Sequence, residues 1–357
     1  MERIHVKVPG EQPQDREYMK QALVLAEKGH GWVNPNPMVG AVLVKDGRII
    51  GEGYHTRYGQ LHAEREAFKN AAERGEETAG ADLYVTLEPC CHTGKQPPCT
   101  EAVLASGVKR VIVGCTDPNP VVAGRGIRLL REKGLEVVAG VLRGECERQN
   151  EVFFHFMRTK LPFTVLKYAM TLDGKTATVL GKSQWITGEA ARKRVHEDRG
   201  RYMAILTGVS TVLADNPQLT CRIPGGKNPI RVIADTNLRT PPSSIVVQTA
   251  RETPTWIVTA VSDAGRKKAY EDAGCRVLSI PAKEGELDLQ AMMQRLGEEK
   301  VDSVMVESGG TLAWSFLKVG LVNRVQAYIA PKIFGGAGAP TPVRGTGVDA
   351  PPEAFLL

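Results

Sequence analysis

The chain has 357 residues, which predicts two domains because one hydrophobic core rarely serves more than about 300 residues. Hydrophobic residues make up 42% of the chain and charged residues 24%, as in ordinary globular proteins. The net charge of +6 is spread along the chain, and only 6% of residues are aromatic, so a nucleic-acid-binding surface is not expected. There is no apolar run of about 18 residues and no apolar core in residues 1–14, so we expect a cytoplasmic protein without a membrane span or secretory signal.

Helices and strands alternate in the apolar pattern of the first half. Asp46-Gly47 lies between two short apolar strands and predicts a tight hairpin turn. The alternation predicts an α/β layer built on a mixed sheet. We expect helices over 15–28, 62–72, 100–106, 127–133 and 143–159, and strands over 38–44, 49–54, 83–87, 110–114 and 135–139.

The pattern breaks at Lys160-Leu161-Pro162 and then starts again. We therefore place a first domain over residues 1–160 and a second α/β domain over 161–357. The second domain is expected to contain a helix over 189–200 and strands over 163–169, 202–207, 230–234, 255–260, 276–280, 303–306 and 323–330.

The cysteines divide into a cluster and a scattered set. The count of seven is odd, and no secretory signal accompanies it, so a disulfide framework is not expected. Cys90, Cys91 and Cys99 lie close together in the sequence. The scattered cysteines are expected to be small buried apolar residues, namely Cys115, Cys146, Cys221 and Cys275.

A histidine and two cysteines suggest a metal site in the first domain. His62 lies at the start of a predicted helix, Cys90 at the end of a predicted strand and Cys99 just before the next helix. Three such ligands can hold zinc and leave the fourth tetrahedral position open for water, which is typical of catalytic zinc. Glu64 need not bind the metal and can carry protons. A His-x-Glu followed by a Pro-Cys pair is typical of zinc nucleobase deaminases, so we expect hydrolytic removal of an amino group from a nitrogen heterocycle.

Other interpretations of these residues remain open. A single histidine on a helix is usually a packing or surface residue, and a single cysteine is usually buried and inert. A structural zinc would require a fourth protein ligand, for which Cys91 or His92 is available. Cys91 could also replace Cys90 as a ligand, although Cys90 directly follows Pro89 at the strand end and is favoured.

Motifs along nearly the whole chain resemble the bifunctional riboflavin-biosynthesis deaminase–reductase family. The long spacing between Cys90 and Cys99, with its paired prolines, is highly specific to that family. In the first half, the matching motifs are Asn34 to Gly40 (NPNPMVG), His62 to Glu64 (HAE), Thr86 to Cys99 (TLEPCCHTGKQPPC), Asp117 to Pro120 (DPNP) and Gly124 to Gly126 (GRG). In the second half, they are Leu172 to Lys175 (LDGK), Ser183 to Thr187 (SQWIT), Thr211 to Pro217 (TVLADNP) and Val306 to Gly310 (VESGG).

For the first domain, the resemblance implies a cytidine-deaminase-like three-layer α/β/α fold with one zinc ion per chain. His62, Cys90 and Cys99 would bind the zinc, and Glu64 would shuttle the proton. The implied reaction converts 2,5-diamino-6-(5-phosphoribosylamino)pyrimidin-4(3H)-one to 5-amino-6-(5-phosphoribosylamino)uracil. Residues that would shape the substrate pocket are Asn34, His92, Lys95 and Asn119. Cys91 stands where the family commonly has serine.

For the second domain, the resemblance implies a dihydrofolate-reductase-like α/β fold that reduces the ribosyl group to ribityl with NADPH. Asp215 is our candidate for proton delivery. The helix expected after Glu307 could hold a phosphate at its start, and a Gly-x-Gly-x-x-Gly fingerprint is absent from this position. Substrate contacts would come from Ser183, Arg199, Leu219, Arg222 and Glu307, and NADPH contacts from Ala169, Trp185, Thr211, Asp215, Thr236, Gly309, Gly310 and Thr311.

Two alternatives to this bifunctional enzyme remain open. The second domain could be an inactive relative that serves binding or oligomerisation, although it retains Lys175, Asp215, Arg222 and Glu307. The chain could instead deaminate free nucleosides or nucleic acids, which the scarce aromatic residues disfavour. The resemblance implies a homo-oligomer that acts on a phosphorylated ribosylaminopyrimidine and has no nucleic-acid or membrane partner. Family members commonly continue past the point where this sequence ends, at Leu357, into a further strand that completes the reductase sheet.

Overall fold

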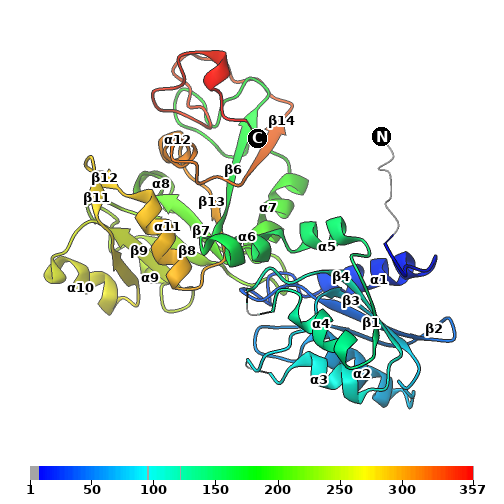
Figure 1. Cartoon of the computed structure of the whole chain (residues 1–357). Helices are drawn as coiled ribbons and strands as arrows, with labels where there is room; N and C mark the ends of the chain where they lie inside the picture. The colour runs from blue at the N-terminus through cyan, green and yellow to red at the C-terminus, as the bar shows by residue number, and fades with distance from the viewer. Residues whose placement is uncertain (1–7, 95, 121, 357) are drawn as a thin grey trace. The chain divides into compact units, whose positions relative to one another are not determined.

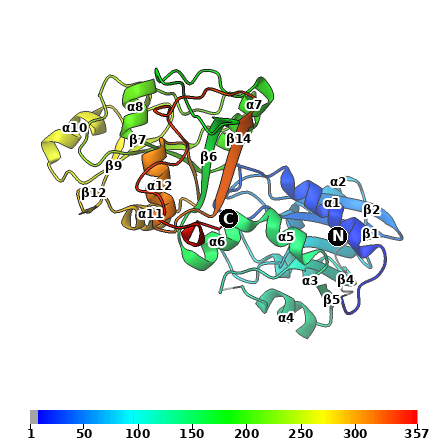
Figure 2. The ribbon, with the colours of Figure 1, turned by 90° about the horizontal axis from the view of Figure 1, so that it is seen from above.

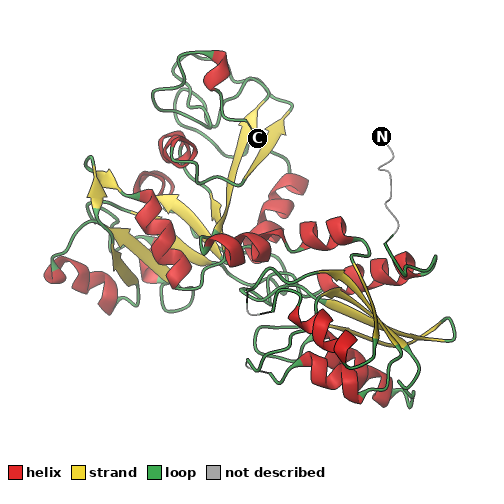
Figure 3. Cartoon of the chain, in the orientation of Figure 1, coloured by secondary structure: helices red, strands yellow, loops and turns green. Residues whose placement is uncertain are grey.

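The computed structural model describes residues 8–94, 96–120 and 122–356 of the chain (Figure 1). The chain forms two compact units, and the division falls between Thr159 and Lys160. Each unit combines helices with its own central sheet (Figure 3). Within the described part of the chain, no helix has both the length and the apolar character needed to span a membrane.

The first unit is built on a five-stranded mixed sheet with the order β2-β1-β3-β4-β5. The pairs β2–β1 and β1–β3 are antiparallel, whereas β3–β4 and β4–β5 are parallel. The elements are α1 (Asp15–Glu27), β1 (Gly40–Lys45), β2 (Arg48–Tyr54), α2 (Ala63–Glu73), β3 (Asp82–Leu87), α3 (Cys99–Ala105), β4 (Arg110–Cys115), α4 (Arg125–Glu132), β5 (Glu136–Ala139), α5 (Arg143–Gln149) and α6 (Glu151–Thr159).

Helices cover both faces of this sheet, because alternate strand residues point to opposite sides. Leu83 and Val85 of β3 pack with residues of α2, α3 and α4 in one apolar cluster. Tyr84, between them, packs with residues of α1, α5 and α6 in another. The unit therefore has the three-layer α/β/α arrangement that was expected.

Two local expectations had different outcomes. The hairpin at Asp46-Gly47 is confirmed, since both residues have positive φ angles of 53° and 74° and Lys45 pairs with Arg48. The helical segment expected over 143–159 is present, but it is divided at Asn150 into two helices. The Asn150 side chain accepts a hydrogen bond from the Met38 backbone N–H and donates one to the Met38 carbonyl, both at 2.8 Å.

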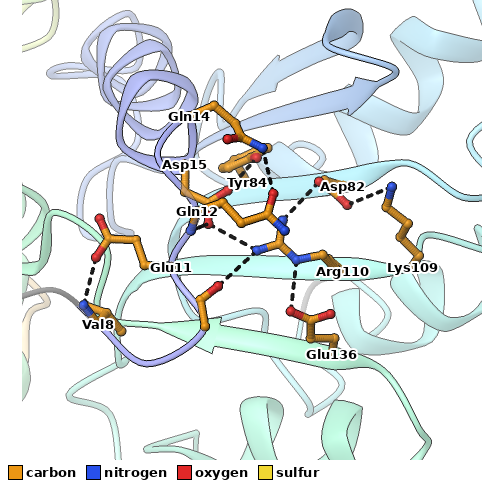
Figure 4. A network of polar contacts seen from close by, with 11 residues as sticks. Val8, Glu11, Gln12, Gln14, Asp15, Asp82, Tyr84, Lys109, Arg110 and Glu136 are labelled. Carbon is orange, nitrogen blue, oxygen red and sulfur yellow. Dashed lines mark hydrogen bonds and ion pairs between the residues drawn. The ribbon is translucent and has the colours of Figure 1, made fainter.

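A buried ionic network joins the N-terminal ends of the parallel strands (Figure 4). Arg110 at the start of β4 donates hydrogen bonds to Asp15 at 3.1 Å, to Asp82 at 3.1 Å and to Glu136 at 3.0 Å. The Tyr84 hydroxyl donates to the other oxygen of Asp15 at 2.8 Å. One guanidinium thus ties α1 to β3, β4 and β5 at the sheet edge where these strands begin.

The second unit contains a seven-stranded sheet with the order β10-β9-β8-β7-β13-β6-β14. Every pairing in this sheet is parallel, and β6 and β14 run side by side along its edge (Figure 2). The described elements are β6 (Phe163–Thr171), α7 (Glu189–Arg201), β7 (Ala204–Gly208), α8 (Val209–Asp215), β8 (Ile230–Ala234), α9 (Ile245–Gln248), β9 (Thr255–Thr259), α10 (Ala264–Asp272), β10 (Arg276–Ser279), β11 (Ala282–Lys283), β12 (Glu286–Leu287), α11 (Leu289–Glu298), β13 (Ser303–Val306), α12 (Gly310–Lys318), β14 (Arg324–Ala330) and the short 3-10 helix η1 (Pro351–Glu353).

The core of the second unit lies under α11 and α12. Met292 and Met293 of α11 and Phe316 of α12 are buried against Leu206 of β7 and Val304 of β13. The central strands are apolar on both faces, as expected for a parallel sheet covered on both sides. The predicted strands of this half are all present, whereas the two-residue strands β11 and β12 were not expected.

Candidate active sites

Three elements of the first unit bring His62, Cys90 and Cys99 together. His62 is the residue before α2, Cys90 follows β3 and Cys99 begins α3. The Nδ1 atom of His62 lies 3.5 Å from the Cys90 Sγ and 3.3 Å from the Cys99 Sγ. All three ligand atoms lie within 4.8 Å of one another, and no other His, Cys, Asp or Glu in the described ranges joins them in a metal-binding group. Neither Cys91 nor His92 therefore supplies a fourth ligand.

The chemistry of these donors fits a zinc ion. A hydrogen bond from Cys99 lowers the pKa of the Cys90 thiol to about 4, although burial acts in the opposite direction. The same hydrogen bond, together with burial, raises the pKa of Cys99. A thiolate beside an imidazole and a second thiol is the soft donor set that zinc prefers, and three protein ligands leave one coordination position free.

Glu64 lies in the first turn of α2, two residues after His62, and is only 3% exposed. Burial raises the pKa of its carboxyl group, and the nearby Cys90 thiolate adds to this effect. Glu64 and His62 line the same cavity, whose volume is about 230 Å³. The carboxyl group is therefore placed to exchange protons with a molecule held beside the three donors.

Two of the expected pocket residues, His92 and Asn119, line this cavity. The buried Nδ1 atom of His92 has no hydrogen-bond partner within the described residues, which leaves it available to a ligand. Asn34 is not among the lining residues, whereas Asn36, two positions later, is. Lys95 lies outside the described residues.

His55, another residue of the cavity wall, was not predicted as a site residue, because no motif in the sequence includes it. Its Nδ1 lies 2.9 Å from the Leu61 carbonyl oxygen and donates to it, so its Nε2 accepts from the Asn36 side chain at 3.2 Å. The His55 ring meets the His62 ring edge-on, with centroids 5.4 Å apart. Burial lowers the pKa of His55, which keeps the ring neutral and able to orient both Asn36 and His62.

Glu88 is a second residue that sequence analysis missed. Its buried carboxylate accepts backbone N–H bonds from Gly124 at 2.8 Å, Gly126 at 2.9 Å, Asp117 at 3.2 Å and Ile127 at 3.2 Å. These bonds join the end of β3 to the start of α4, where negative charge is favourable. Glu88 therefore holds the chain in place two residues before Cys90.

In the second unit, a carboxylate and two cations meet above the sheet. Glu307 follows β13 and receives hydrogen bonds from Arg199 of α7 at 2.8 and 3.1 Å. Lys167 of β6 donates to the same carboxylate at 3.2 Å. Burial acts to raise the pKa of Glu307, but Lys167 and Arg199 outweigh it and lower the pKa to about 2. Lys167 was not predicted as a site residue, because nothing in the sequence near it distinguishes it from other lysines.

The charge around Glu307 is positive on balance. Arg222 is exposed and, within the described residues, its guanidinium makes no hydrogen bond. Partial desolvation of the guanidinium and the nearby charge of Arg199 lower the pKa of Arg222. Lys167 and Arg199 donate hydrogen bonds to the Glu307 carboxylate, and Arg222 interacts with it only electrostatically. Three cations near one carboxylate suit an anionic ligand such as a phosphate.

The residues expected along NADPH follow neighbouring strands of the parallel sheet. Ligands of such sheets bind in the crevice beyond the carboxyl ends of the strands. The strands β8, β7, β13 and β6 are adjacent in the sheet, and each carries or precedes part of the expected set. Ala169 lies near the end of β6, Thr211 and Asp215 lie in α8 after β7, Thr236 follows β8, and Gly309, Gly310 and Thr311 begin α12 after β13.

The remaining expected residues differ in exposure. Leu219 is buried and has a positive φ angle of 54°. Ser183 is half-buried, and Trp185 is 61% exposed. The Arg192 guanidinium lies 4.8 Å from the centroid of the Trp185 ring. Trp185 is therefore not a core residue.

Comparison with known proteins matches both units. Residues 12–115 match the cytidine and deoxycytidylate deaminase zinc-binding region, and residues 162–356 match the RibD C-terminal domain. The riboflavin biosynthesis protein RibD of Actinobacillus pleuropneumoniae is 49% identical over 343 residues, which cover 96% of this chain and 90% of that protein. RibD of Bacillus amyloliquefaciens is 46% identical over 92% of this chain and 88% of its own length. The chain belongs to the RibD family.

Solved structures of the family agree with this assignment. The diaminohydroxyphosphoribosylaminopyrimidine deaminase/5-amino-6-(5-phosphoribosylamino)uracil reductase of Thermotoga maritima is 41% identical, with a TM-score of 0.84 over 95% of this chain and 93% of that one. RibD of Acinetobacter baumannii is 36% identical, with a TM-score of 0.86 over 97% of this chain and 94% of that one.

Membership of the RibD family assigns the activity class. The chain is a bifunctional enzyme of riboflavin biosynthesis that joins a zinc-dependent deaminase to an NADPH-dependent reductase. The expected fold class, a deaminase-like α/β domain followed by a reductase α/β domain, is confirmed. The cysteines are all free, and Cys115, Cys146, Cys221 and Cys275 are buried as expected.

Proposed function

We propose that the domain over residues 1–160 removes an amino group from 2,5-diamino-6-(5-phosphoribosylamino)pyrimidin-4(3H)-one. Water enters, ammonia leaves, and the product is 5-amino-6-(5-phosphoribosylamino)uracil. The domain over 161–357 then reduces the ribosyl group of this product to ribityl with NADPH. The observation that carries the proposal is the clustering of His62, Cys90 and Cys99 beside a cavity that His62, Cys90 and Glu64 line. The printed activities of the Thermotoga maritima relative support the choice of substrates.

In the deamination, His62, Cys90 and Cys99 would hold zinc, which when bound acts as a Lewis acid toward water. Glu64 takes a proton from the attacking water and delivers it to the departing amino nitrogen. Its burial suits this role, because a raised pKa lets a carboxyl group both accept and return a proton near neutral pH. We propose that hydrogen bonds from His92 and Asn119, which line the cavity, and from Asn34 and Lys95 hold the substrate.

In the reduction, NADPH supplies a hydride to the sugar carbon, and a proton must reach the sugar oxygen that is released. We propose Asp215 as the residue that assists this proton delivery. Arg199 and Arg222 would hold the substrate phosphate, since a guanidinium can donate two parallel hydrogen bonds to it. Glu307, Ser183 and Leu219 would contact the rest of the substrate. NADPH would lie along Ala169, Trp185, Thr211, Asp215, Thr236 and the residues from Gly309 to Thr311.

The buried cluster of Lys167, Arg199 and Glu307 favours an active second domain over a degenerate one. Each of these side chains is only 13% exposed. Burying charged groups is destabilising, so a domain with a purely structural role would gain nothing by retaining them. The alternative of an inactive domain that serves oligomerisation predicts no NADPH oxidation when the deaminated substrate is added.

We further propose that the enzyme works as a homo-oligomer in the cytoplasm, without nucleic acid or membrane partners. Large apolar side chains are exposed near the ends of β6 and β14, among them Ile329 near the end of β14 and Leu172 and Ile333 just beyond the two strands. The backbone N–H of Leu172 donates to the Lys332 carbonyl at 2.9 Å, so these segments lie together. Exposed apolar groups gathered in this way are typical of subunit contacts. A monomeric mass in sedimentation equilibrium would contradict this proposal.

A zinc assay on two cysteine variants tests the deaminase site. We expect about one zinc ion per chain in the native enzyme and none in Cys99→Ala, because two protein ligands hold zinc poorly. Ammonia release should disappear with the zinc, while NADPH-dependent reduction of 5-amino-6-(5-phosphoribosylamino)uracil continues. Cys91→Ala is the matched control and should keep both zinc and ammonia release. Loss of zinc from Cys91→Ala but not from Cys99→Ala would overturn the ligand assignment.

A further inference from the structure

Three consecutive residues of the loop after α8 are bonded to helix α7. The Arg199 guanidinium donates to the Thr220 carbonyl at 3.1 Å. The Cys221 thiol donates to the His196 carbonyl at 3.2 Å, and the Arg222 backbone N–H donates to the His196 Nδ1, also at 3.2 Å. His196 therefore contacts two successive loop residues, through its backbone and through its ring.

The ring of His196 acts here as an acceptor. A backbone N–H can only donate, so the Nδ1 atom must be unprotonated and any proton on the neutral ring lies on Nε2. Burial lowers the pKa of His196, and the charges of Arg199 and Arg222 lower it further, which together outweigh the opposite effects of Glu307 and of the Thr220 backbone. A lowered pKa favours the neutral ring, whose lone pair accepts the Arg222 N–H in the structure.

Helix α7 is itself anchored to the sheet two residues away from this contact. The buried Asp198 carboxylate accepts a hydrogen bond from the Gln326 side chain at 2.6 Å and another from the Tyr328 hydroxyl at 3.1 Å. Gln326 and Tyr328 both belong to β14. The helix that carries His196 is thus held to a strand of the core sheet, and it provides a rigid support for the loop.

We propose that His196 is a positioning residue of the reductase site: by accepting the Arg222 N–H, its ring places the Arg222 guanidinium for the substrate phosphate. His196 thereby sets the preference of the reductase for a phosphorylated over a dephosphorylated ribosylaminouracil. The inference rests on the proposed role of Arg222 in phosphate binding. His196 is not required to touch the substrate, because it acts through the backbone of the residue that does.

The test uses the full-length enzyme with saturating NADPH. The two substrates are 5-amino-6-(5-phosphoribosylamino)uracil and the same compound without its phosphate, and the quantity compared is the ratio of their kcat/KM values. His196→Leu, which has no acceptor, should reduce this ratio about tenfold, the effect of one misplaced hydrogen bond to a charged group. The change should come from KM, with kcat for the phosphorylated substrate nearly unaltered. His196→Gln, whose amide oxygen can accept the Arg222 N–H, should keep most of the native ratio.

The variants separate the possible outcomes. Equal ratios in His196→Leu and the native enzyme, or equal losses in His196→Leu and His196→Gln, would overturn the role of His196. Arg222→Gln must itself reduce the ratio; if it does not, the proposed phosphate role of Arg222 is the part that fails. Ammonia release and NADPH affinity serve as controls for folding. Should His196→Leu not bind NADPH, His196→Phe preserves the ring volume without an acceptor and is expected to lose the same discrimination.

Discussion

At the scale of single residues, the proposed role of Glu64 in proton transfer depends on the burial of its side chain. It lies in the first turn of α2, and its carboxyl group is almost wholly removed from solvent. Burial raises the pKa of this carboxyl group above its ordinary value, whereas an exposed glutamate would remain a weak base. Proton transfer of the kind proposed requires such a shift toward neutral pH.

Glu64→Gln should therefore abolish most of the ammonia release without affecting the metal. We expect the rate to fall by about 10²- to 10⁴-fold, the usual contribution of a general acid–base group. Zinc content should stay at the native level, because the amide preserves the size of the side chain and Glu64 is not a ligand. Glu73→Gln, at the exposed far end of the same helix, is the control. Loss of zinc in Glu64→Gln would show instead that Glu64 coordinates the metal.

At the scale of elements, the position of α2 depends on its close contact with β2. A Cβ atom on Gly53 would lie 2.3 Å from the Ala67 backbone nitrogen and 2.4 Å from the Ala63 carbonyl oxygen. Only glycine allows the helix backbone to approach so closely. The helix that begins after His62 and carries Glu64 is therefore set against the sheet by a residue with no side chain.

Gly53→Ala should force α2 away from β2 and disturb the zinc site from a distance. We expect a loss of about 1–3 kcal/mol in the free energy of unfolding of this domain, as for other overpacked sites. Zinc affinity and ammonia release should fall together, since His62 moves with the helix. Gly144→Ala is the matched control, because its Cβ would meet only the end of the flexible Arg148 side chain. Native zinc affinity in Gly53→Ala, measured by competition with a chelator, would refute this account.

At the scale of the whole molecule, each unit has its own sheet and its own apolar clusters. The ionic network around Arg110 belongs entirely to the first unit, in which Arg110 is 4% exposed. The network joins strands at the edge where they begin, whereas Cys90 follows the carboxyl end of β3. Its contribution is therefore to the stability of the deaminase domain and not to its chemistry.

Arg110→Met should destabilise the deaminase domain alone. Removing one partner of a buried ionic network leaves carboxylates unpaired and typically costs about 3–5 kcal/mol. The urea concentration that halves ammonia release should fall, while that for NADPH-dependent reduction should not change. Arg48→Ala, which removes an exposed ion pair with Glu76, should alter neither transition appreciably. Equal shifts of both activities in Arg110→Met would mean that the two domains unfold as one cooperative unit.

Much of the fold and of the zinc site could be predicted, because the necessary information is local. Apolar periodicity located the strands of both sheets, and the Asp46-Gly47 turn identified the hairpin. His62, Cys90 and Cys99 could be grouped because each stands next to a helix or strand terminus on the same side of a small α/β layer. The break at Asn150 escaped prediction, since it depends on a bond to Met38, 112 positions earlier.

The sequence by itself determined the order of the elements, the family and the candidate metal donors, because these depend on residue type and spacing along the chain. Only the tertiary structure decided which other groups serve the sites. Lys167 and Glu307 are joined by a hydrogen bond although they lie 140 positions apart in the sequence, and the hydrogen-bonded pair Glu88 and Gly126 lies 38 positions apart. The packing of strands and helices that are distant in the chain determines which of these groups lie together. A buried charge requires hydrogen-bond partners, and because those partners come from distant segments, a local sequence pattern does not predict them.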